Sequence, residues 1–246
     1  MNRAEKILFR TGLLLPHRFR FLKIPVAYFR YFLQRVMVSG KKGRPVIIVA
    51  MPKSGSTWLE NIFMSLKNTY SIMPPACILY EQIHGNSHQQ TFERRILKWA
   101  KNKSVVIKLH SSYSTEFFRE ILDLNAIFIL LHRDIKEVSN SHVSYVTKTP
   151  FHPHFKRAKI NEEDVKHKFE TEMEEWISSW KSVVPDELIV NYQEMLERPK
   201  ETLSRVLNYY DEEGDIDAAL AFNSLVKMRD RSPHKSFFRG SKILKS

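Results

Sequence analysis

Residues 45–66 read PVIIVAMPKSGSTWLENIFMSL and join a strand, a short turn and a helix. The first six residues are mostly β-branched and apolar, which predicts a buried parallel strand. Leu59, Ile62, Phe63 and Leu66 then recur at helical spacing. In such a turn, backbone N–H groups, the helix dipole and a lysine converge on a phosphate-sized anion. The segment therefore predicts an anion-binding loop in an α/β domain.

The order of residues in this loop differs from that of the common nucleoside-triphosphate loop. That motif is Gly-x4-Gly-Lys-Ser/Thr, whereas Lys53 comes two residues before Gly55. An ordinary helix start, with Ser54 or Ser56 as the N-cap, is the alternative interpretation of the segment.

The loop resembles the 5′-phosphosulfate loop of the sulfotransferases that use 3′-phosphoadenosine 5′-phosphosulfate (PAPS). The resemblance covers roughly residues 45–240. It implies that PAPS is the co-substrate and that six loop residues bind it. These residues are Lys53, Ser54, Gly55, Ser56, Thr57 and Trp58.

An arginine and a serine carry the next part of the resemblance. Arg133 follows the predicted strand 126–131, and Ser141 stands eight residues later. In the family, an arginine and a serine at this spacing bind the 3′-phosphate. An arginine at a strand end can pair with a phosphate through two hydrogen bonds, and a hydroxyl about two turns into the next helix can reach the same group.

Two further segments resemble the family's adenine contacts. Tyr192 follows the segment LIVN, which resembles the strand that precedes the family's tyrosine near the adenine. Asn223, Ser224 and Leu225 resemble a turn that lines the adenine, with Leu225 in place of the family's aromatic residue. We therefore expect adenine stacking to depend more on Trp58.

The segment FFRG near the C-terminus resembles the family's Arg-Lys-Gly loop, which closes over the 3′-phosphate. Only Arg239 and Gly240 match that loop cleanly. The Gly-Asp-Trp segment that follows it in the family is absent, so the lid is expected to close incompletely or through other residues.

The run SVVIKLH at residues 104–110 carries the predicted chemistry. It resembles the Lys-Thr/Ser-His segment of cytosolic sulfotransferases, whose histidine is the catalytic base. The resemblance implies that His110 accepts the proton of an acceptor hydroxyl, because an alcohol is a poor nucleophile at neutral pH. Lys53 and Lys108 would stabilise negative charge on the bridging oxygen and the departing phosphate.

Length and composition favour one globular domain. The chain has 246 residues, of which 43% are hydrophobic and 12% aromatic, enough to bury a sizeable core. We expect a P-loop-like three-layer α/β fold over residues 45–246, with a parallel sheet of about four or five strands flanked by helices. The single cysteine, Cys77, excludes an internal disulfide framework and fits a cytoplasmic location.

Residues 162–182 are predicted to form a helix with a large apolar face. The alternative to a core role for this face is a ligand platform, which we consider less favourable. Its members are Phe169, Met173, Trp176, Ile177 and Trp180.

Residues 1–44 form a basic arm that precedes the domain. They contain eleven Lys and Arg residues and one acid, Glu5, which gives +10 of the total formal charge of +12. Basic residues interrupt its apolar runs, so a transmembrane helix of about 20 apolar residues is excluded, and no convincing signal cleavage site follows. The charge is accompanied by no known nucleic-acid motif, so we expect no nucleic-acid partner.

An amphipathic helix is predicted within the arm. It would begin at Pro25 and end near Ser39 and Gly40. Its apolar positions are Val26, Phe29, Leu33, Val36 and Met37. They would pack on the domain or, with the basic residues, lie on an anionic membrane surface as a peripheral attachment.

Together these features predict an enzyme that transfers a sulfuryl group from PAPS to a hydroxyl of an alcohol, a carbohydrate or a lipid-linked acceptor. The transfer would be direct and in-line, and no metal is expected, because lysines and backbone amides supply the positive field. Two alternatives are an atypical P-loop nucleotide-dependent kinase and a noncatalytic membrane adaptor with a vestigial nucleotide site. The kinase would need a Lys-Ser/Thr pair directly after the glycine, which the loop lacks.

Overall fold

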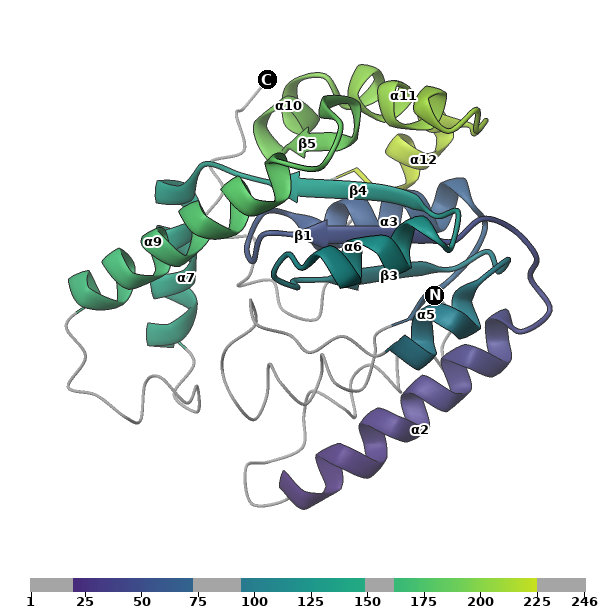
Figure 1. The fold of residues 1–246 in the computed structure, drawn as a ribbon, viewed down its shortest axis with the longest axis horizontal. Coiled ribbons are helices and arrows are strands. Elements are labelled where there is room, and N and C mark those ends of the chain that lie inside the picture. The colour runs from purple at the N-terminus through teal and green to yellow at the C-terminus, as the bar shows by residue number, and fades with distance from the viewer. Residues whose placement is uncertain (1–19, 73–93, 149–161, 225–246) are drawn as a thin grey trace.

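The computed structural model describes residues 20–72, 94–148 and 162–224. They contain a five-stranded sheet in the order β2-β3-β1-β4-β5, with all neighbouring strands parallel. The strands are β1 (Val46–Ala50), β2 (Ser71–Ile72), β3 (Val106–Leu109), β4 (Ile127–His132) and β5 (Ile189–Asn191). Helices cover both faces of the sheet (Figure 1). The predicted three-layer α/β fold is confirmed.

Two hydrophobic layers lie on opposite faces of the sheet. One layer packs against α3 (Ser56–Leu66), α10 (Tyr192–Glu197), α11 (Pro199–Tyr209) and α12 (Ile216–Phe222). The other packs against α5 (Arg94–Ala100), α6 (Thr115–Leu122), α7 (Ile135–Lys148) and α9 (Glu162–Lys181). A short 3₁₀ helix, Asp186–Leu188, leads into β5. Strand β1 is buried along its whole length, which explains its uninterrupted apolar sequence.

The helix predicted over residues 162–182 is observed as α9. Its Trp176 and Trp180 are buried in the layer that contains α5 and α6. The expected core role of these tryptophans is therefore correct.

The strand alternation decides which side of the sheet carries the predicted chemistry. Val106 belongs to the layer under α3, whereas Ile107 and Leu109 belong to the opposite layer. Because successive side chains of a strand point to opposite faces, Lys108 lies on the α3 side.

The connections that follow β1 and its neighbouring strands diverge at the carboxyl end of β1. Helix α3 follows β1 and lies on one face, whereas α6 follows β3, α7 follows β4, and both lie on the other face. In parallel sheets, ligands bind outside the carboxyl ends of strands where the connections diverge in this way. The loop after β1 occupies that position.

Helix α2 (Arg20–Val38) corresponds to the predicted arm helix. The prediction that it begins at Pro25 is wrong, because Pro25 lies inside it. A proline removes one helical hydrogen bond, but helix can still continue on both sides of it. The helix ends one residue before Ser39, as expected.

One side of α2 packs on the domain. Val38 is fully buried, Tyr31 contacts the core, and the Arg35 guanidinium lies 4.7 Å from the centre of the Trp99 ring. The expectation that Phe29 and Val36 share the packed face is wrong, because both are exposed. The packed side is rotated relative to the predicted apolar stripe, since aromatic and cation–π contacts decide which residues face inward.

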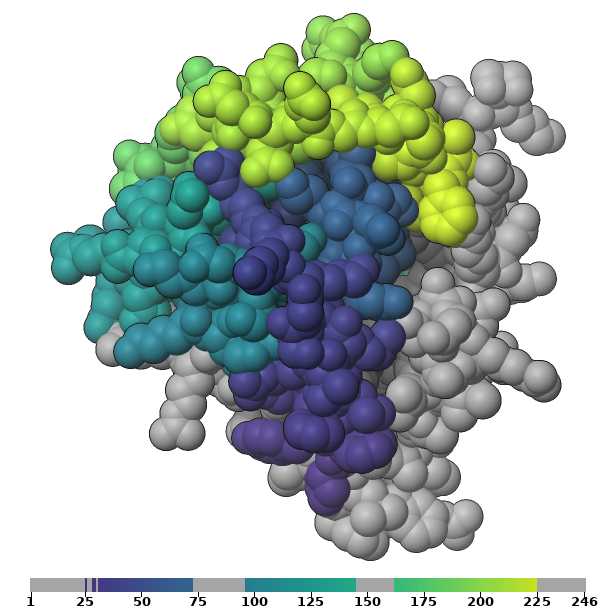
Figure 2. Space-filling model, turned by 90° about the vertical axis from the view of Figure 1, so that its right-hand side faces the viewer, coloured from purple at the N-terminus to yellow at the C-terminus, as the bar shows by residue number. Residues whose placement is uncertain are grey.

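Figure 2 shows α2 (purple) exposed on the surface of the protein. Among the side chains of α2 that the structure describes, the exposed large hydrophobic ones are Tyr28, Phe29, Phe32 and Val36. Beyond the helix, Lys42 forms an antiparallel bridge with Lys103, so the chain joins the domain before residue 45. No helix within the described residues is both long and apolar enough to cross a membrane. The boundary between arm and domain stays a prediction.

Candidate nucleotide-binding and active site

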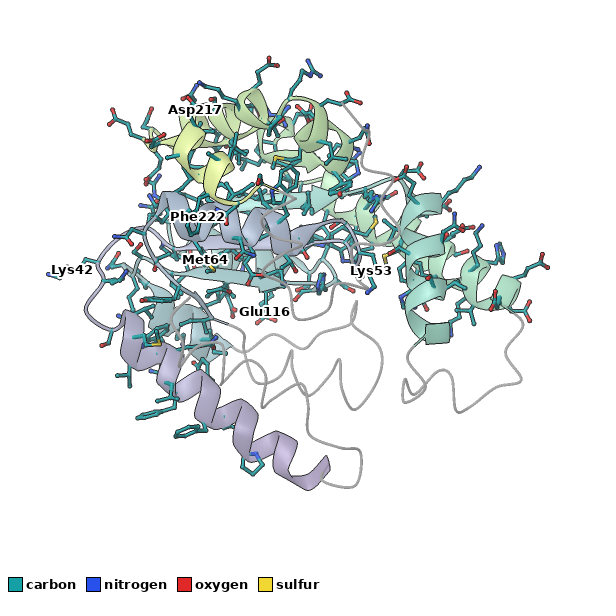
Figure 3. All side chains as sticks on the ribbon, turned by 180° about the vertical axis from the view of Figure 1, so that it is seen from behind. Lys42, Lys53, Met64, Glu116, Asp217 and Phe222 are labelled. Carbon is teal, nitrogen blue, oxygen red and sulfur yellow. The ribbon has the colours of Figure 1, made fainter. Side chains whose placement is uncertain are left out.

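The loop between β1 and α3 has the geometry of an anion-binding turn. The Met51 N–H donates to the Leu131 carbonyl at 2.9 Å, which ties the loop to β4. Lys53 and Gly55 adopt left-handed conformations, with φ of 65° and 84°, so the chain turns sharply before the helix. Figure 3 shows Lys53 at the end of the sheet near α7 and α9, with Lys42 at the opposite end.

The loop serines do not cap α3. Gly55 is the N-cap residue, and no side chain caps the helix. The buried Ser54 hydroxyl instead donates to the Met51 carbonyl at 2.6 Å, and Ser56 is already the first helical residue. The interpretation of these serines as ordinary N-caps is therefore wrong. An uncapped helix N-terminus keeps its partial positive charge for an anion.

Gly55 is required by its conformation and by its neighbour. Its φ of 84° favours glycine, and a Cβ atom at this position would lie 2.3 Å from Cε2 of Tyr192. Tyr192 is the first residue of α10, which follows β5. Any side chain at residue 55 would displace the Tyr192 ring or distort the loop.

Tyr192 contacts two other residues that are predicted to bind PAPS, Arg133 and Trp58, and Trp58 in turn contacts Asn223. The Arg133 guanidinium lies 4.4 Å from the centre of the Tyr192 ring. The Trp58 ring meets Tyr192 edge to face, with centroids 6.5 Å apart, and the Trp58 indole N–H donates to the Asn223 carbonyl at 2.9 Å. Burial raises the pKa of the Tyr192 phenol, and the Arg133 charge partly opposes this shift.

Arg133 lies just beyond β4 and pairs with the first turn of α7. Its Nε donates to Glu137 Oε2 at 2.7 Å, and Asp134 accepts the Glu137 N–H as a helix-start contact. Ser141 is half-buried two turns further along α7. The order strand, arginine and helix with serine is therefore present, while joint binding of a 3′-phosphate stays a prediction.

Lys108 is held in a polar cluster between β3 and α3. Its ammonium donates to Glu60 Oε2 at 2.9 Å and to Thr57 Oγ1 at 3.3 Å. The Ser71 hydroxyl on β2 donates to the other carboxylate oxygen, Oε1 of Glu60. Thr57 and Glu60 are three residues apart on α3 and hence share a face. Lys108 thereby contacts the predicted phosphosulfate loop directly.

His110 is buried at the end of β3. Its Nδ1 lies 2.6 Å from the Ala50 carbonyl oxygen, at the end of β1. A carbonyl oxygen only accepts hydrogen bonds, so Nδ1 carries the proton. In the neutral imidazole the lone pair then resides on Nε2, as a general base at this position requires.

The backbone beside His110 is anchored by α9. The Ser111 carbonyl accepts hydrogen bonds from two indole N–H groups, Trp176 at 2.9 Å and Trp180 at 3.1 Å. Buried tryptophans need such partners. The sequence predicted that these rings are buried but not that they fix the segment after the Lys-x-His strand.

His132, the last residue of β4, was not a predicted site residue. Burial and the nearby Lys181 charge lower its pKa to about 4, while Glu194 acts in the opposite direction. The side chain is therefore neutral at physiological pH. Its place beside Arg133 was visible in the sequence, whereas its burial depends on the helices packed around β4.

Several predicted residues cannot be placed. Leu225, Arg239 and Gly240 lie outside the described residues. Ser224 is the last described residue and is half-buried. Within the described ranges, no group of His, Cys, Asp and Glu side chains is arranged to hold a metal ion.

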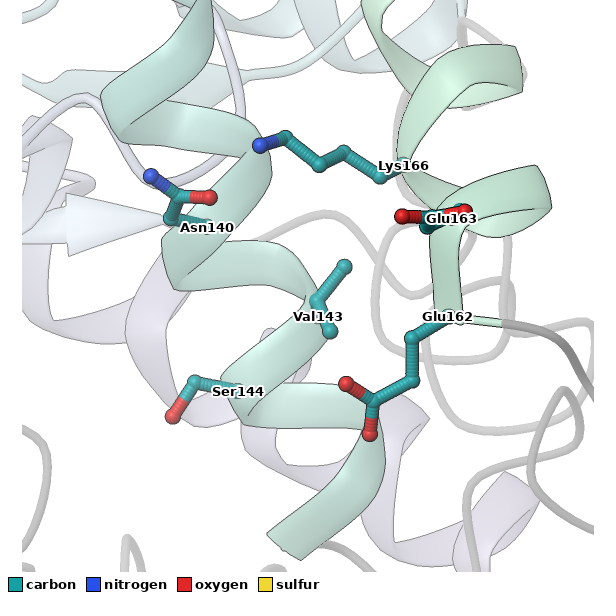
Figure 4. Close-up of a pocket in the computed structure, with 6 residues that line it drawn as sticks. All are labelled: Asn140, Val143, Ser144, Glu162, Glu163 and Lys166. Carbon is teal, nitrogen blue, oxygen red and sulfur yellow. The ribbon is translucent and has the colours of Figure 1, made fainter.

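A cavity of about 380 Å³ lies between α7 and α9 (Figure 4). Its lining comprises Asn140, Val143, Ser144, Glu162, Glu163 and Lys166. None of these is a predicted donor-binding or catalytic residue, so the cavity has no part in the assignment of the site.

The geometry can be compared with known proteins at this point. A sequence model described as the sulfotransferase domain matches residues 44–237. The chain belongs to the sulfotransferase family. The resemblance deduced from the loop is confirmed. In a comparison with curated proteins, none matches the sequence of this chain.

The fold can also be compared with solved structures. Mouse sulfotransferase SULT7A1, complexed with PAP, is 14% identical, with a TM-score of 0.56 over 82% of this chain and 73% of that one. The sulfotransferase domain of the curacin biosynthetic pathway is 12% identical, with a TM-score of 0.45 over 71% of this chain and 76% of that one. At 14% identity, the first of these similarities supports the fold alone.

Proposed function

We propose that this sulfotransferase moves a sulfuryl group from PAPS to an acceptor hydroxyl by direct in-line transfer. The observation that carries the proposal is the contact of Tyr192 with the loop at Gly55, with Trp58 and with Arg133. An anion-binding turn, two aromatic rings and an arginine thus lie together, although they come from three separate regions of the sequence. This set suits a nucleotide with an anion at each end.

The two anionic ends would meet different groups. The helix N-terminus and Lys53 suit the 5′-phosphosulfate, whereas Arg133 suits the 3′-phosphate, because a guanidinium pairs well with a phosphate. The rings of Trp58 and Tyr192 offer apolar surface for the adenine base, which separates the two anionic groups of the nucleotide.

PAPS supplies an activated sulfuryl group whose leaving group is a phosphate. His110 Nε2 accepts the acceptor's hydroxyl proton as the acceptor oxygen bonds to sulfur. The bond from sulfur to the bridging phosphate oxygen breaks, which leaves adenosine 3′,5′-bisphosphate and a sulfate ester. Lys53 and Lys108 stabilise the negative charge that develops on the bridging oxygen. The imidazolium then returns its proton to solvent.

Membership of the sulfotransferase family sets aside the kinase alternative. The loop also lacks the Lys-Ser/Thr pair after its glycine. The noncatalytic adaptor remains an alternative, against which the joint presence of Lys53, Lys108 and His110 argues.

The donor proposal is tested by calorimetry with adenosine 3′,5′-bisphosphate and adenosine 5′-monophosphate. The bisphosphate should bind about ten- to a hundredfold more tightly, because one charged, hydrogen-bonded contact is worth about 1.5 to 3 kcal/mol. Equal affinity for the two nucleotides would overturn the proposal.

The acceptor is best sought with radiolabelled PAPS. Extracts separated into soluble small molecules, carbohydrates and lipids should yield one fraction that gains label in the presence of the protein. The His110→Ala variant serves as the control for uncatalysed transfer. Binding of the bisphosphate without label in any fraction would favour the adaptor.

We also propose that α2 attaches the protein to an anionic membrane surface. The exposed Tyr28, Phe29 and Phe32 lie on a helix within a segment of net charge +10, and aromatic and basic residues suit an anionic interface. In a flotation assay, anionic vesicles should bind the protein, and neutral ones should not. Binding should weaken with salt and with Phe29→Ser and Phe32→Ser. Absence from both vesicle types would exclude this attachment.

A further inference from the structure

Glu60 is a buried carboxylate beside the predicted anion site. It belongs to α3, one turn after the phosphosulfate loop, and it is hydrogen-bonded through both oxygens. Lys108 contacts Oε2, and the Ser71 hydroxyl contacts Oε1. The carboxylate is thus fixed from two strands, and its charge lies close to the Thr57 end of the loop.

A carboxylate in this place opposes the binding of an anionic donor. The charges of Glu60 and Lys108 cancel at a distance, so the pair attracts an approaching anion less than a lone ammonium would. At short range, however, the ammonium keeps its hydrogen bond to Thr57 Oγ1. The ammonium held in this way stabilises negative charge that develops beside it during the transfer more than negative charge that the bound nucleotide already carries.

We infer that Glu60 is a positioning residue that holds the Lys108 ammonium against the loop and limits the affinity of the site for the spent nucleotide. The inference rests on the proposed function, because it takes adenosine 3′,5′-bisphosphate as the product. Glu60 does not touch the reacting atoms. It acts through Lys108, whose position it fixes together with Ser71.

The decisive variant is Glu60→Gln, which removes the charge and keeps the shape. It should bind adenosine 3′,5′-bisphosphate about tenfold more tightly in calorimetry, since one unit of like charge is lost near the anion. With water in place of the acceptor, it should also hydrolyse PAPS about tenfold more slowly in a single turnover, because Lys108 loses its ionic partner. The rate is measured as the release of labelled sulfate. A purely structural role would weaken binding and slow the reaction together.

A second variant, Ser71→Ala, tests the position of the Glu60 carboxylate without changing its charge. It removes the hydrogen bond to Glu60 Oε1 and changes no charge. The bisphosphate affinity should stay within twofold, and the single-turnover rate should fall about three- to tenfold. An unchanged rate would overturn the positioning role, even if Glu60→Gln fails to fold.

The matched control is Glu212→Gln. Glu212 also pairs with lysine and arginine side chains, those of Lys67 and Arg44, but these lie at the opposite end of the sheet. Its substitution should lower the melting temperature and leave bisphosphate affinity and rate unchanged.

If the wild type binds the bisphosphate and Glu60→Gln binds it equally or more weakly, the inference about Glu60 is overturned and the proposed function is not affected. A wild type that does not bind it would overturn the proposed function as well.

Discussion

Two ion pairs lie at the two proposed ends of the candidate nucleotide site. Lys108 and Glu60 pair near the proposed sulfuryl end, with side chains 13% and 11% exposed. Arg133 and Glu137 pair near the proposed 3′-phosphate end, with side chains 23% and 51% exposed. In both, the cation comes from a strand end and the carboxylate from a helix. They differ in burial and in the number of further contacts.

Because of that difference, we expect the buried Lys108 to keep its carboxylate partner and the more exposed Arg133 to exchange its partner for a ligand. Exposed pairs contribute about 0–1 kcal/mol, so Arg133 can exchange Glu137 for a phosphate at little cost. Removing one partner of a buried pair costs about 3–5 kcal/mol, so Lys108 is expected to keep Glu60 throughout. Under the proposed function, the site thus combines a preorganised reacting end around Lys108 with an adaptable anchoring end around Arg133.

The largest effect is expected at the reacting end, from His110→Ala. Transfer to the acceptor should fall about a hundred- to ten-thousandfold, because base removal commonly has this cost. Bisphosphate affinity should change little, since the imidazole acts on the acceptor. Rates and calorimetry measured on the same preparation check both points. A rate close to wild type would assign the proton transfer to another residue.

At the anchoring end, Arg133→Ala should weaken bisphosphate binding about ten- to a hundredfold. Adenosine 5′-monophosphate, which lacks the 3′-phosphate, should lose far less affinity. Lys200→Ala is the control for charge removal, because Lys200 pairs with Asp217 on the exposed surface. Equal losses for both nucleotides would mean that Arg133 does not distinguish the two ends.

His132, next to the anchoring arginine, gives a pH-dependent prediction. Its pKa is about 4 in the folded protein and near 6.5 in the unfolded chain. Between these values the unfolded chain binds a proton that the folded protein does not, so stability falls as the pH drops from 6.5 towards 4. Melting curves should show a smaller loss in His132→Gln than in wild type. His167→Gln, on the exposed face of α9, should behave like wild type.

The smallest effect is expected from Glu137→Gln. Loss of this exposed charge should tighten bisphosphate binding by about threefold or less, against the tenfold expected for Glu60→Gln. Calorimetry of the two variants side by side compares the pairs directly. A larger effect for Glu137 than for Glu60 would reverse the proposed roles of the two ends.

Much of the fold followed from local patterns. The apolar strand, the small-residue turn and the helical spacing after it predicted β1, the loop and α3, and the parallel sheet is as expected. The face that carries Lys108 follows from the strand alternation. By contrast, the arm helix was predicted with a wrong start and a wrong packed face, because Pro25 is tolerated inside α2 and Arg35 stacks on Trp99.

The sequence by itself determined which residue types stand at the strand ends, since motif order and periodicity are local properties of the chain. Only the tertiary structure decided their partners. The pairing of Lys108 with Glu60, the contact of Tyr192 with Gly55 and the low pKa of His132 join residues that are 48, 137 and 49 to 62 positions apart. Such contacts depend on how helices settle on the sheet, because burial and charge act through space and not along the chain.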